Sequence, residues 1–327
     1  MPAKTFIEAI REGLSDEMRR DESVIVLGED VGKKGGVFLA TDGLWAEFGD
    51  DRVIDTPLTE SQIVGTSIGA AMNGLRPIAE IQFADFIFPA FNQIVSEAAR
   101  IRYRSNNGYG VPMTIRAPYG GGVHGALYHS QSVEAFFTHV PGLKVVVPST
   151  PYDAKGLLRS SVRDDDPVLF FEHKKMYRSV RGDVPDGEYV VPLGRAAVTR
   201  PGTQVSVIAY GLMAHYALEA ADRVADEGIS VEVVDLRTLR PLDKETLLDS
   251  VRKTGKCLVV YEDNRFGGYG AEVAAIVAEE AFDYLDGPVV RVAGPDVPAV
   301  PYNHVLEDWF MVNPEKIADS IRKLAAY

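Results

Sequence analysis

The 327-residue sequence contains a single cysteine, Cys257, so it has no internal disulfide. This cysteine lies in the apolar run Cys257–Val260, and we interpret it as a small buried hydrophobic residue rather than a reactive thiol. An unpaired thiol is typical of the reducing cytoplasm, or of an organelle matrix if a transit peptide has been removed. We therefore expect a core that holds together without covalent cross-links.

Positive charge is also scarce, because 47 acidic residues outnumber 34 basic ones and the net charge is −13. Non-specific binding to nucleic acid or to anionic lipid depends on basic patches, so neither is expected. No apolar run approaches the roughly 18 residues of a membrane span, and the N-terminus carries no secretory pattern. Instead, Thr5 and Glu8 form a candidate capping box at the start of an amphipathic helix.

Signatures of several enzyme classes are missing. The glycines of Gly267–Gly270 lack the Gly-x-Gly-x-x-Gly spacing of dinucleotide sites, and no glycine-rich loop ends in Lys-Ser or Lys-Thr. No His or Cys cluster has the spacing of metal ligands. No Gly-x-Ser-x-Gly elbow is present either. The sequence therefore predicts neither a nucleotide site nor a serine hydrolase.

Short β-rich runs alternate with helical patterns along the whole chain, which is typical of α/β proteins with parallel sheets. The length corresponds to about two domains of roughly 150 residues each. We predict a first domain over residues 1–180, a linker over 181–203 and a second domain over 204–327. The linker is where charges, Gly and Pro interrupt the pattern.

The expected elements follow from these patterns. Strands are predicted at Val24–Leu27, Ile78–Ile81, Met113–Arg116, Lys144–Val147, Val168–Phe171, Val205–Ala209, Val231–Leu236, Cys257–Tyr261 and Val289–Val292. Helices are predicted at Glu60–Asn73, Pro89–Tyr103, Tyr152–Arg163, Ala214–Glu227, Asp243–Lys253 and Ala271–Tyr284. A final helix is predicted after Asn313, an N-cap residue followed by proline.

Three stretches combine polar, aromatic and glycine residues beyond what core packing needs. Asp55–Glu60 forms a turn that delivers an acidic residue to the start of an apolar helix. Glu80–Phe86 is a strand that ends in a polar and aromatic cluster. Gly120–Ser132 is a glycine-rich loop that carries two histidines, His124 and His129.

Each stretch also has an interpretation without function. Glu60 would complement the dipole of the helix that it begins. The Glu80–Phe86 cluster would belong to the core, and a loop histidine such as His129 would be a solvated surface residue. Taken one at a time, the patterns favour these structural interpretations. A functional interpretation is favoured only because all three stretches occur together, in this order, along one chain.

In this order, the stretches resemble the beta subunits of branched-chain 2-oxo acid, pyruvate and acetoin dehydrogenase complexes. The resemblance covers essentially the whole chain. It extends to three further segments, Leu27–Gly32, Pro148–Gly156 and Val234–Leu239. His124–Ser132 is most similar to the branched-chain enzymes, whereas Asp153–Gly156 and Gly267–Pro298 resemble pyruvate or acetoin enzymes equally well.

The resemblance implies a fold and an assembly. A transketolase-type pyrimidine-binding domain would be followed by the transketolase C-terminal domain. Two beta and two alpha subunits would form a heterotetramer, with Gly65–Ala71 and Phe83–Phe91 as interface surfaces. The acyl product would pass to a lipoyl domain of a dihydrolipoyl acyltransferase core. A basic module of that core would dock on the acidic second domain near Asp286 and Tyr327.

The resemblance also implies thiamine diphosphate as a cofactor that the alpha and beta subunits share. Glu60 matches the glutamate that exchanges a proton with the aminopyrimidine ring, and we expect it to be largely buried. Phe86 matches an aromatic residue stacked on that ring, which is tyrosine in some relatives. Leu58 and Gln82 match further contacts to the ring. His129 matches the histidine beside the substrate and the incoming lipoyl group.

The resemblance concerns two kinds of metal site, and the sequence matches only one of them. Ser161, Asp164 and Asp166 align with a loop that binds a structural monovalent cation, potassium, although loop capping by aspartate explains the same residues. The divalent-metal motif of the family, Gly-Asp-Gly, is absent, because Gly49-Asp50 and Gly182-Asp183 are followed by Asp and Val. The magnesium that holds the diphosphate would therefore lie on the alpha subunit.

Two other functions stay open at this point. One is a non-catalytic assembly subunit that only docks the acyltransferase core, and the other is a self-sufficient transketolase-type enzyme. Glu60, Phe86 and His129 in register disfavour the first, because scaffolding does not need them. The missing metal motif disfavours the second. The sequence also leaves open the choice among branched-chain 2-oxo acids, pyruvate and acetoin as substrate.

Overall fold

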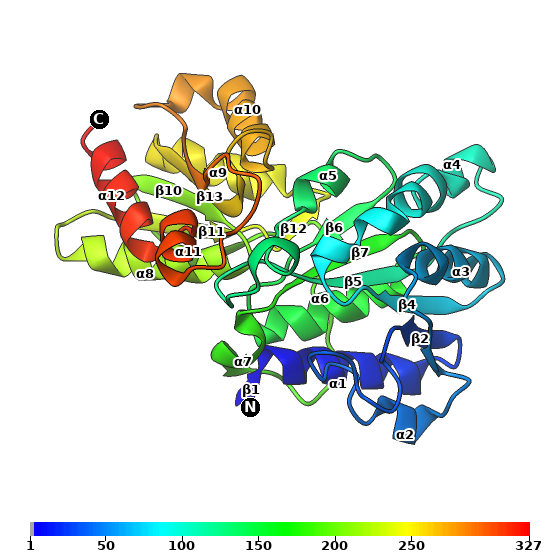
Figure 1. Ribbon diagram of the computed structural model, residues 1–327. Coiled ribbons are helices and arrows are strands. Elements are labelled where there is room, and N and C mark those ends of the chain that lie inside the picture. Colours follow the sequence, from blue (N-terminus) through cyan, green and yellow to red (C-terminus); the bar gives the residue numbers. More distant parts are fainter. Residues whose placement is uncertain (1–2) are drawn as a thin grey trace. The chain divides into compact units, whose positions relative to one another are not determined.

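The computed structural model describes residues 3–327, which form two compact units (Figure 1). The first unit comprises the chain up to Tyr119 together with Phe136–Leu193. The second comprises Gly120–Ala135 and Gly194–Tyr327. The glycine-rich histidine loop therefore belongs to the second unit, although it precedes the predicted linker in the sequence. Within residues 3–327, no helix is both long and apolar enough to cross a membrane.

A parallel sheet forms the centre of the first unit. Its strands lie in the order β6, β7, β5, β4, β2 and β3, and neighbours run parallel. Their bounds are Val24–Gly28 (β2), Val53–Asp55 (β3), Arg76–Glu80 (β4), Thr114–Tyr119 (β5), Lys144–Val146 (β6) and Val168–His173 (β7). Most of these strands are buried along nearly their whole length, as expected for continuous Val, Ile and Leu runs in a sheet covered on both faces. A separate antiparallel pair joins β1 (Ala3–Thr5) to β8 (Arg181–Asp183).

The helices of the first unit begin with a confirmed prediction. In α1 (Phe6–Arg20), the Thr5 hydroxyl accepts from the Glu8 N–H, and the Glu8 carboxylate accepts from the Thr5 N–H, so the capping box is present. The further helices are α2 (Leu44–Phe48), α3 (Glu60–Met72), α4 (Ile101–Arg104), α6 (Pro151–Arg163) and α7 (Met176–Ser179). A short helix, α5 (Glu134–Thr138), crosses the boundary between the units along the chain.

One predicted helix is wrong in its form. The pattern over 89–103 predicts a single α-helix, but the chain forms separate turns there. They are the 3-10 turn η2 (Phe88–Ala90), the π-helix η3 (Gln93–Ala98) and then α4, and a further 3-10 turn, η1 (Ala84–Phe86), precedes them. Apolar spacing reports that one face is buried, and it does not distinguish an α-turn from the tighter 3-10 or wider π-turn. The helical character was therefore predictable and the breaks were not.

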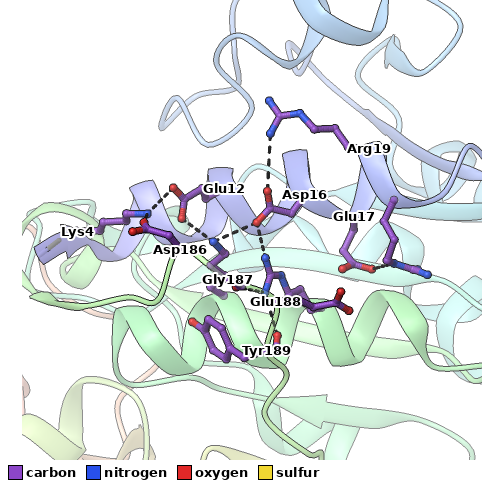
Figure 2. A network of polar contacts seen from close by, with 12 residues as sticks. Lys4, Glu12, Asp16, Glu17, Arg19, Asp186, Gly187, Glu188 and Tyr189 are labelled. Atoms are coloured by element: carbon purple, nitrogen blue, oxygen red, sulfur yellow. Dashed lines mark hydrogen bonds and ion pairs between the residues drawn. The ribbon is translucent and has the colours of Figure 1, made fainter. Parts of the chain in front are cut away.

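A line of ion pairs joins α1 to α6 (Figure 2). The buried Lys155 of α6 lies 2.7 Å from a Glu12 carboxylate oxygen and 3.1 Å from one of Asp16, both on α1. Arg159, one turn further along α6, also pairs with Asp16. Residues four apart lie on one face of a helix, so the basic face of α6 meets the acidic face of α1. Arg159 also donates to carbonyl oxygens of the segment 187–189, at 3.0 and 3.3 Å, and fastens that segment to α6.

The second unit is built on another sheet, in the order β14, β13, β10, β11 and β9. Neighbours are parallel except β9, which is antiparallel to β11. The strands of this sheet are β9 (Ala197–Arg200), β10 (Val205–Ala209), β11 (Val231–Asp235), β13 (Cys257–Asn264) and β14 (Val290–Gly294), and the short strand β12 (Thr238–Arg240) lies outside it. The helical segments are η4 (Ala126–Tyr128), α8 (Leu212–Ala225), α9 (Lys244–Thr254), α10 (Gly270–Glu280), η5 (Phe282–Tyr284), α11 (His304–Phe310) and α12 (Pro314–Ala325). The strands and helices predicted for this half are confirmed within a few residues at their ends.

Two sequence features of the second unit serve packing. Cys257 is buried in β13, as expected, and burial raises the pKa of its thiol to about 12. Gly268 and Gly270 lie against the ring of Tyr261, where a Cβ would come within 2.5 and 2.1 Å of ring atoms. Because these glycines have no side chain, the segment packs closely against β13. Packing therefore explains the glycine-rich segment, and a nucleotide site is not needed to explain it.

Candidate active site

Three neighbouring strands of the first unit end at the same edge. Gly28, at the end of β2, pairs with Asp55 at the end of β3 and with Glu80 at the end of β4. The N–H of Thr56 donates to the Gly28 carbonyl at 2.9 Å and extends the pairing into the loop after β3. Ligand sites of parallel sheets lie at the carboxyl ends of the strands. The loops after β2, β3 and β4 are therefore placed to form one site.

These loops carry the residues predicted for the first unit. The turn after β3 leads through Leu58, which is 71% exposed, to Glu60, the first residue of α3. Gln82 and Phe86 follow β4, and both are half-buried. The Gln82 side-chain amide donates to the carbonyl oxygen of Glu29 at 3.3 Å, so the loop after β4 contacts the loop after β2. Glu60 is half-buried in this chain rather than largely buried as expected.

Glu29 is a further acidic residue at this edge, and no pattern in the sequence singled it out. Partial burial raises the pKa of Glu29, and the nearby charges of Asp30 and Glu60 raise it further, against the opposing effect of Lys34. Glu29 and Glu60 therefore lie close enough to interact electrostatically. Repulsion from neighbouring carboxylates favours retention of the proton on Glu29. The position of Glu29 in the Leu27–Gly32 segment, two residues after the predicted strand Val24–Leu27, is a signal that would have found it.

Phe86 belongs to an aromatic cluster. Its ring meets the ring of Phe83 edge to face, with centroids 5.4 Å apart, and Phe83 meets Phe38 in the same way at 5.3 Å. The ammonium of Lys174 lies 5.6 Å from the centroid of the Phe83 ring. These contacts hold the turn η1 in place. Phe86 itself stays half-buried at the end of the cluster.

A buried charge network supports the same strand ends. The Arg116 guanidinium of β5 lies 2.5 Å from a carboxylate oxygen of Glu80, and it donates to both oxygens of Glu172 at 2.6 and 2.8 Å. The Tyr177 hydroxyl donates to Glu172 at 2.6 Å. Burial raises the pKa of Glu80, and the positive charge of Arg116 opposes that rise. The network fixes the end of β4 two residues before Gln82.

The polar and flat groups at this edge fit the pyrimidine end of the cofactor that the resemblance implies. An aminopyrimidine has hydrogen-bonding atoms around its edge and an apolar face. Glu60 and Gln82 offer hydrogen-bonding groups, and Phe86 offers a ring face. The Thr56 hydroxyl is shielded from solvent and has no hydrogen-bond partner among residues 3–327. In the same part of the chain, no group of three or more His, Cys, Asp or Glu side chains is arranged to hold a metal ion.

His129 lies in the second unit, directly after η4. The Gly120 N–H donates to the Gln131 carbonyl at 3.1 Å and closes the base of the loop. Gly125 packs against His129, because a Cβ at position 125 would lie 2.7 Å from the His129 carbonyl oxygen. His129 itself is exposed, as a residue that meets an incoming substrate needs to be.

The residues aligned with a monovalent-cation loop have other partners. The Ser161 hydroxyl donates to the Leu157 carbonyl at 2.8 Å, within α6. Both Asp164 oxygens accept from the Lys144 ammonium at 2.6 Å, and Asp164 also caps the N–H of Asp166 at 2.9 Å. Asp166 forms an ion pair with Arg102. Protein cations therefore already balance these carboxylates.

Comparisons with known proteins agree on one family. The family described as "Transketolase, pyrimidine binding domain" matches residues 3–180, and "Transketolase, C-terminal domain" matches residues 194–317. The chain is 60% identical to the 2-oxoisovalerate dehydrogenase subunit beta of Bacillus subtilis (strain 168), over the whole of both chains. It is 48% identical to the pyruvate dehydrogenase E1 component subunit beta of the same organism, again over both whole chains. A solved structure described as "Split gene transketolase, inactive beta4 tetramer" has a TM-score of 0.80 at 26% identity and 98% coverage of each chain.

Proposed function

Because this chain belongs to the transketolase-like beta subunits of thiamine-diphosphate-dependent 2-oxo acid dehydrogenases, we propose that it supplies the pyrimidine half of the active site of a branched-chain enzyme. The family and the two-domain α/β fold are as expected from the sequence. The observation that carries the proposal is the meeting of Glu29, Glu60 and Gln82 at the edge formed by β2, β3 and β4.

Each of these residues would have a distinct task. When bound, thiamine diphosphate would supply a nucleophilic thiazolium carbon for the 2-oxo group and a positively charged ring as the sink for the electron pair released with carbon dioxide. Glu60 would exchange a proton with a ring nitrogen, and Glu29 would be a second acidic group beside it. Gln82 would present its amide to the edge of the ring, and Leu58 and Phe86 would cover its faces. His129 would assist the transfer of the acyl group to a lipoyl group.

The proposal includes an alpha subunit that holds the diphosphate and its magnesium ion. Two surface features of the first unit support such a partner. On α3, a Cβ added at Gly69 would meet no atom within 4 Å, so this helix face leaves room for another chain. Phe88 and Phe136 are 44% and 54% exposed, although their rings lie 5.5 Å apart, edge to face. Exposed aromatic clusters are typical of interfaces.

The assembly would be a heterotetramer of two alpha and two beta subunits, docked to a dihydrolipoyl acyltransferase core. The solved relative is described as an inactive tetramer of beta chains, which suits a chain that carries half a site. A non-catalytic docking role would leave the carboxyl groups at the strand edge without a task. In place of a potassium ion at Ser161, Asp164 and Asp166, we assign the balancing charge to Lys144.

The 60% identity to the 2-oxoisovalerate subunit of Bacillus subtilis, against 48% to the pyruvate subunit of the same organism, supports a branched-chain 2-oxo acid as substrate. Pyruvate and acetoin are the alternatives. An activity panel on the reconstituted alpha–beta enzyme would decide among them. We expect 2-oxoisovalerate to give the highest kcat/KM, and a preference for pyruvate or acetoin would replace this assignment.

The catalytic role is tested by Glu60→Gln in the reconstituted enzyme. An amide does not exchange a proton with the ring, although it keeps most contacts, so decarboxylation should fall by roughly two orders of magnitude. Cofactor affinity should weaken far less. Glu22→Gln removes the same charge from an exposed position and serves as the control. Near-normal turnover of the Glu60 variant would remove the basis of the proposal.

A further inference from the structure

The loop that carries His129 is held by two buried carboxylates of its own unit. At the base of the loop, a Glu262 oxygen accepts from the Gly121 N–H at 2.6 Å and from the Ser132 hydroxyl at 3.3 Å. These two residues lie at opposite ends of the loop. Glu262 therefore ties the ends of the loop together and leaves its middle to be held elsewhere.

The second carboxylate, Glu307 of α11, holds the segment just before His129. Only 1% exposed, it accepts from the N–H groups of Gly122 at 3.0 Å and His124 at 3.3 Å. Its other oxygen lies against Nδ1 of the His124 imidazole, a contact that becomes an ion pair when the ring is protonated. The ring of His304, at the start of α11, packs on the His124 ring with centroids 3.9 Å apart. A carboxylate is costly to bury without hydrogen bonds, and here the loop supplies two backbone N–H donors to one of its oxygens.

The held segment has an unfavourable backbone conformation. His124 and Ala126 have φ angles of +57° and +56°, in the left-handed region that non-glycine residues seldom adopt. Such conformations persist where the surroundings over-determine them, and they concentrate at functional sites. The bonds from Glu307 to Gly122 and His124 are contacts of this kind. Of the two strained residues, they act directly on His124, which lies in the same loop as His129.

We propose that Glu307, acting through His124, is a positioning residue for His129, an inference that rests on the acyl-transfer role proposed for His129. The Glu307 carboxylate touches no reacting group in this account. Loss of its charge would release His124 from the left-handed conformation. The loop would then relax, and the His129 imidazole would lose its fixed place.

A double-mutant cycle in the reconstituted alpha–beta enzyme tests the proposal. Glu307→Gln, His129→Ala and the double variant are compared for acyl transfer to a lipoyl domain and for decarboxylation with an artificial electron acceptor. We expect Glu307→Gln to lower acyl transfer roughly tenfold and decarboxylation far less, with the double variant no slower than His129→Ala alone. Additive losses would overturn the proposal, because residues that act through one another are not additive.

Hydrogen exchange provides a readout that needs no cofactor. In the full chain, Glu307→Gln should speed amide exchange in peptides covering 121–124 while the unfolding temperature stays near that of the wild type. Unchanged exchange would overturn the proposal. Asp308→Asn is the matched control, since this neighbour on α11 is exposed and carries the same charge. It should behave as the wild type in every assay.

A second variant separates the contribution of the His124 side-chain contact with Glu307 from that of the left-handed backbone at position 124. Glycine adopts a φ of +57° without strain, so His124→Gly removes the imidazole and permits the same backbone. We expect acyl transfer to fall, though by less than in Glu307→Gln, and full activity would rule out a role for His124. If His129→Ala itself leaves acyl transfer intact, the proposed role of His129 fails. If His129→Ala impairs it and Glu307→Gln does not, the positioning role alone fails.

Discussion

The ammonium nitrogen of Lys144 lies 2.6 Å from each carboxylate oxygen of Asp164. Asp166 lies 3.7 Å from the same ammonium and pairs with Arg102 on its other side. Lys144 thus supplies positive charge that balances the carboxylates of this loop. A cation that is part of the chain does not depend on the salt in solution.

We predict that potassium has no specific effect on stability. The wild-type chain should unfold at the same temperature in potassium chloride and in choline chloride of equal ionic strength. Lys144→Ala should lower the free energy of unfolding by roughly 1 kcal/mol. This is the lower end of the cost of leaving a charged group unpaired, because both side chains are partly exposed. The variant should then regain stability with potassium. Lys323→Ala, at an exposed position, is the control. A potassium-dependent unfolding temperature of the wild type would contradict the assignment.

The buried network around Arg116 gives a larger expected effect. Arg116→Met leaves Glu80 and Glu172 buried without their cation, which costs about 3–5 kcal/mol. Arg104→Met removes an exposed arginine paired with Glu97 and should cost under about 1 kcal/mol. Urea unfolding of both variants measures the difference. Similar losses in the two variants would show that the buried network contributes little.

Glu134 should make stability depend on pH. Burial raises its pKa from 4.5 to about 8, and the charges of Asp263 and Glu262 add to the rise, while the Tyr210 hydroxyl opposes it. Between these values the folded state binds more protons than the unfolded state, so stability falls as pH rises. The pKa of Asp263 is raised to about 6, so Asp263 also titrates at the lower end of the range from pH 6 to 8, whereas Glu134 titrates at its upper end.

The variant that tests this is Glu134→Gln, which keeps an oxygen for the Tyr210 hydroxyl. Unfolding measured from pH 6 to 8 should show a flatter dependence than in the wild type. The control is Glu315→Gln, an exchange of a partly exposed glutamate on α12. An equally steep dependence in the Glu134 variant would mean that another group titrates.

The strands that place the site were predictable to different degrees. Val24–Leu27 and Ile78–Ile81 are apolar runs, and they correspond to β2 and β4. The strand between them in the sequence, β3 (Val53–Asp55), was not predicted, because three residues with one buried side chain carry no periodic signal. The turn that follows it was found through Glu60 and the resemblance rather than through its strand.

The contacts that hold the His129 loop were beyond sequence patterns. Two histidines in a glycine-rich loop indicated more than packing, which pointed to the loop itself. Its partners Glu262 and Glu307 lie in β13 and α11, far along the chain, and ordinary helix or strand patterns surround them. Only the folding of the second unit brings these carboxylates to the loop. Their burial, which distinguishes them from surface glutamates, is a property of the fold.

Dependence on an alpha subunit is tested most directly by isothermal titration calorimetry of this chain alone with thiamine diphosphate and magnesium. Because the chain supplies only pyrimidine-side residues, we predict weak binding or none, and no decarboxylase activity. Adding the cognate alpha subunit should restore both, with saturation at about one alpha per beta chain. Micromolar binding by the isolated chain would contradict the account, since it would require a complete cofactor site within these residues.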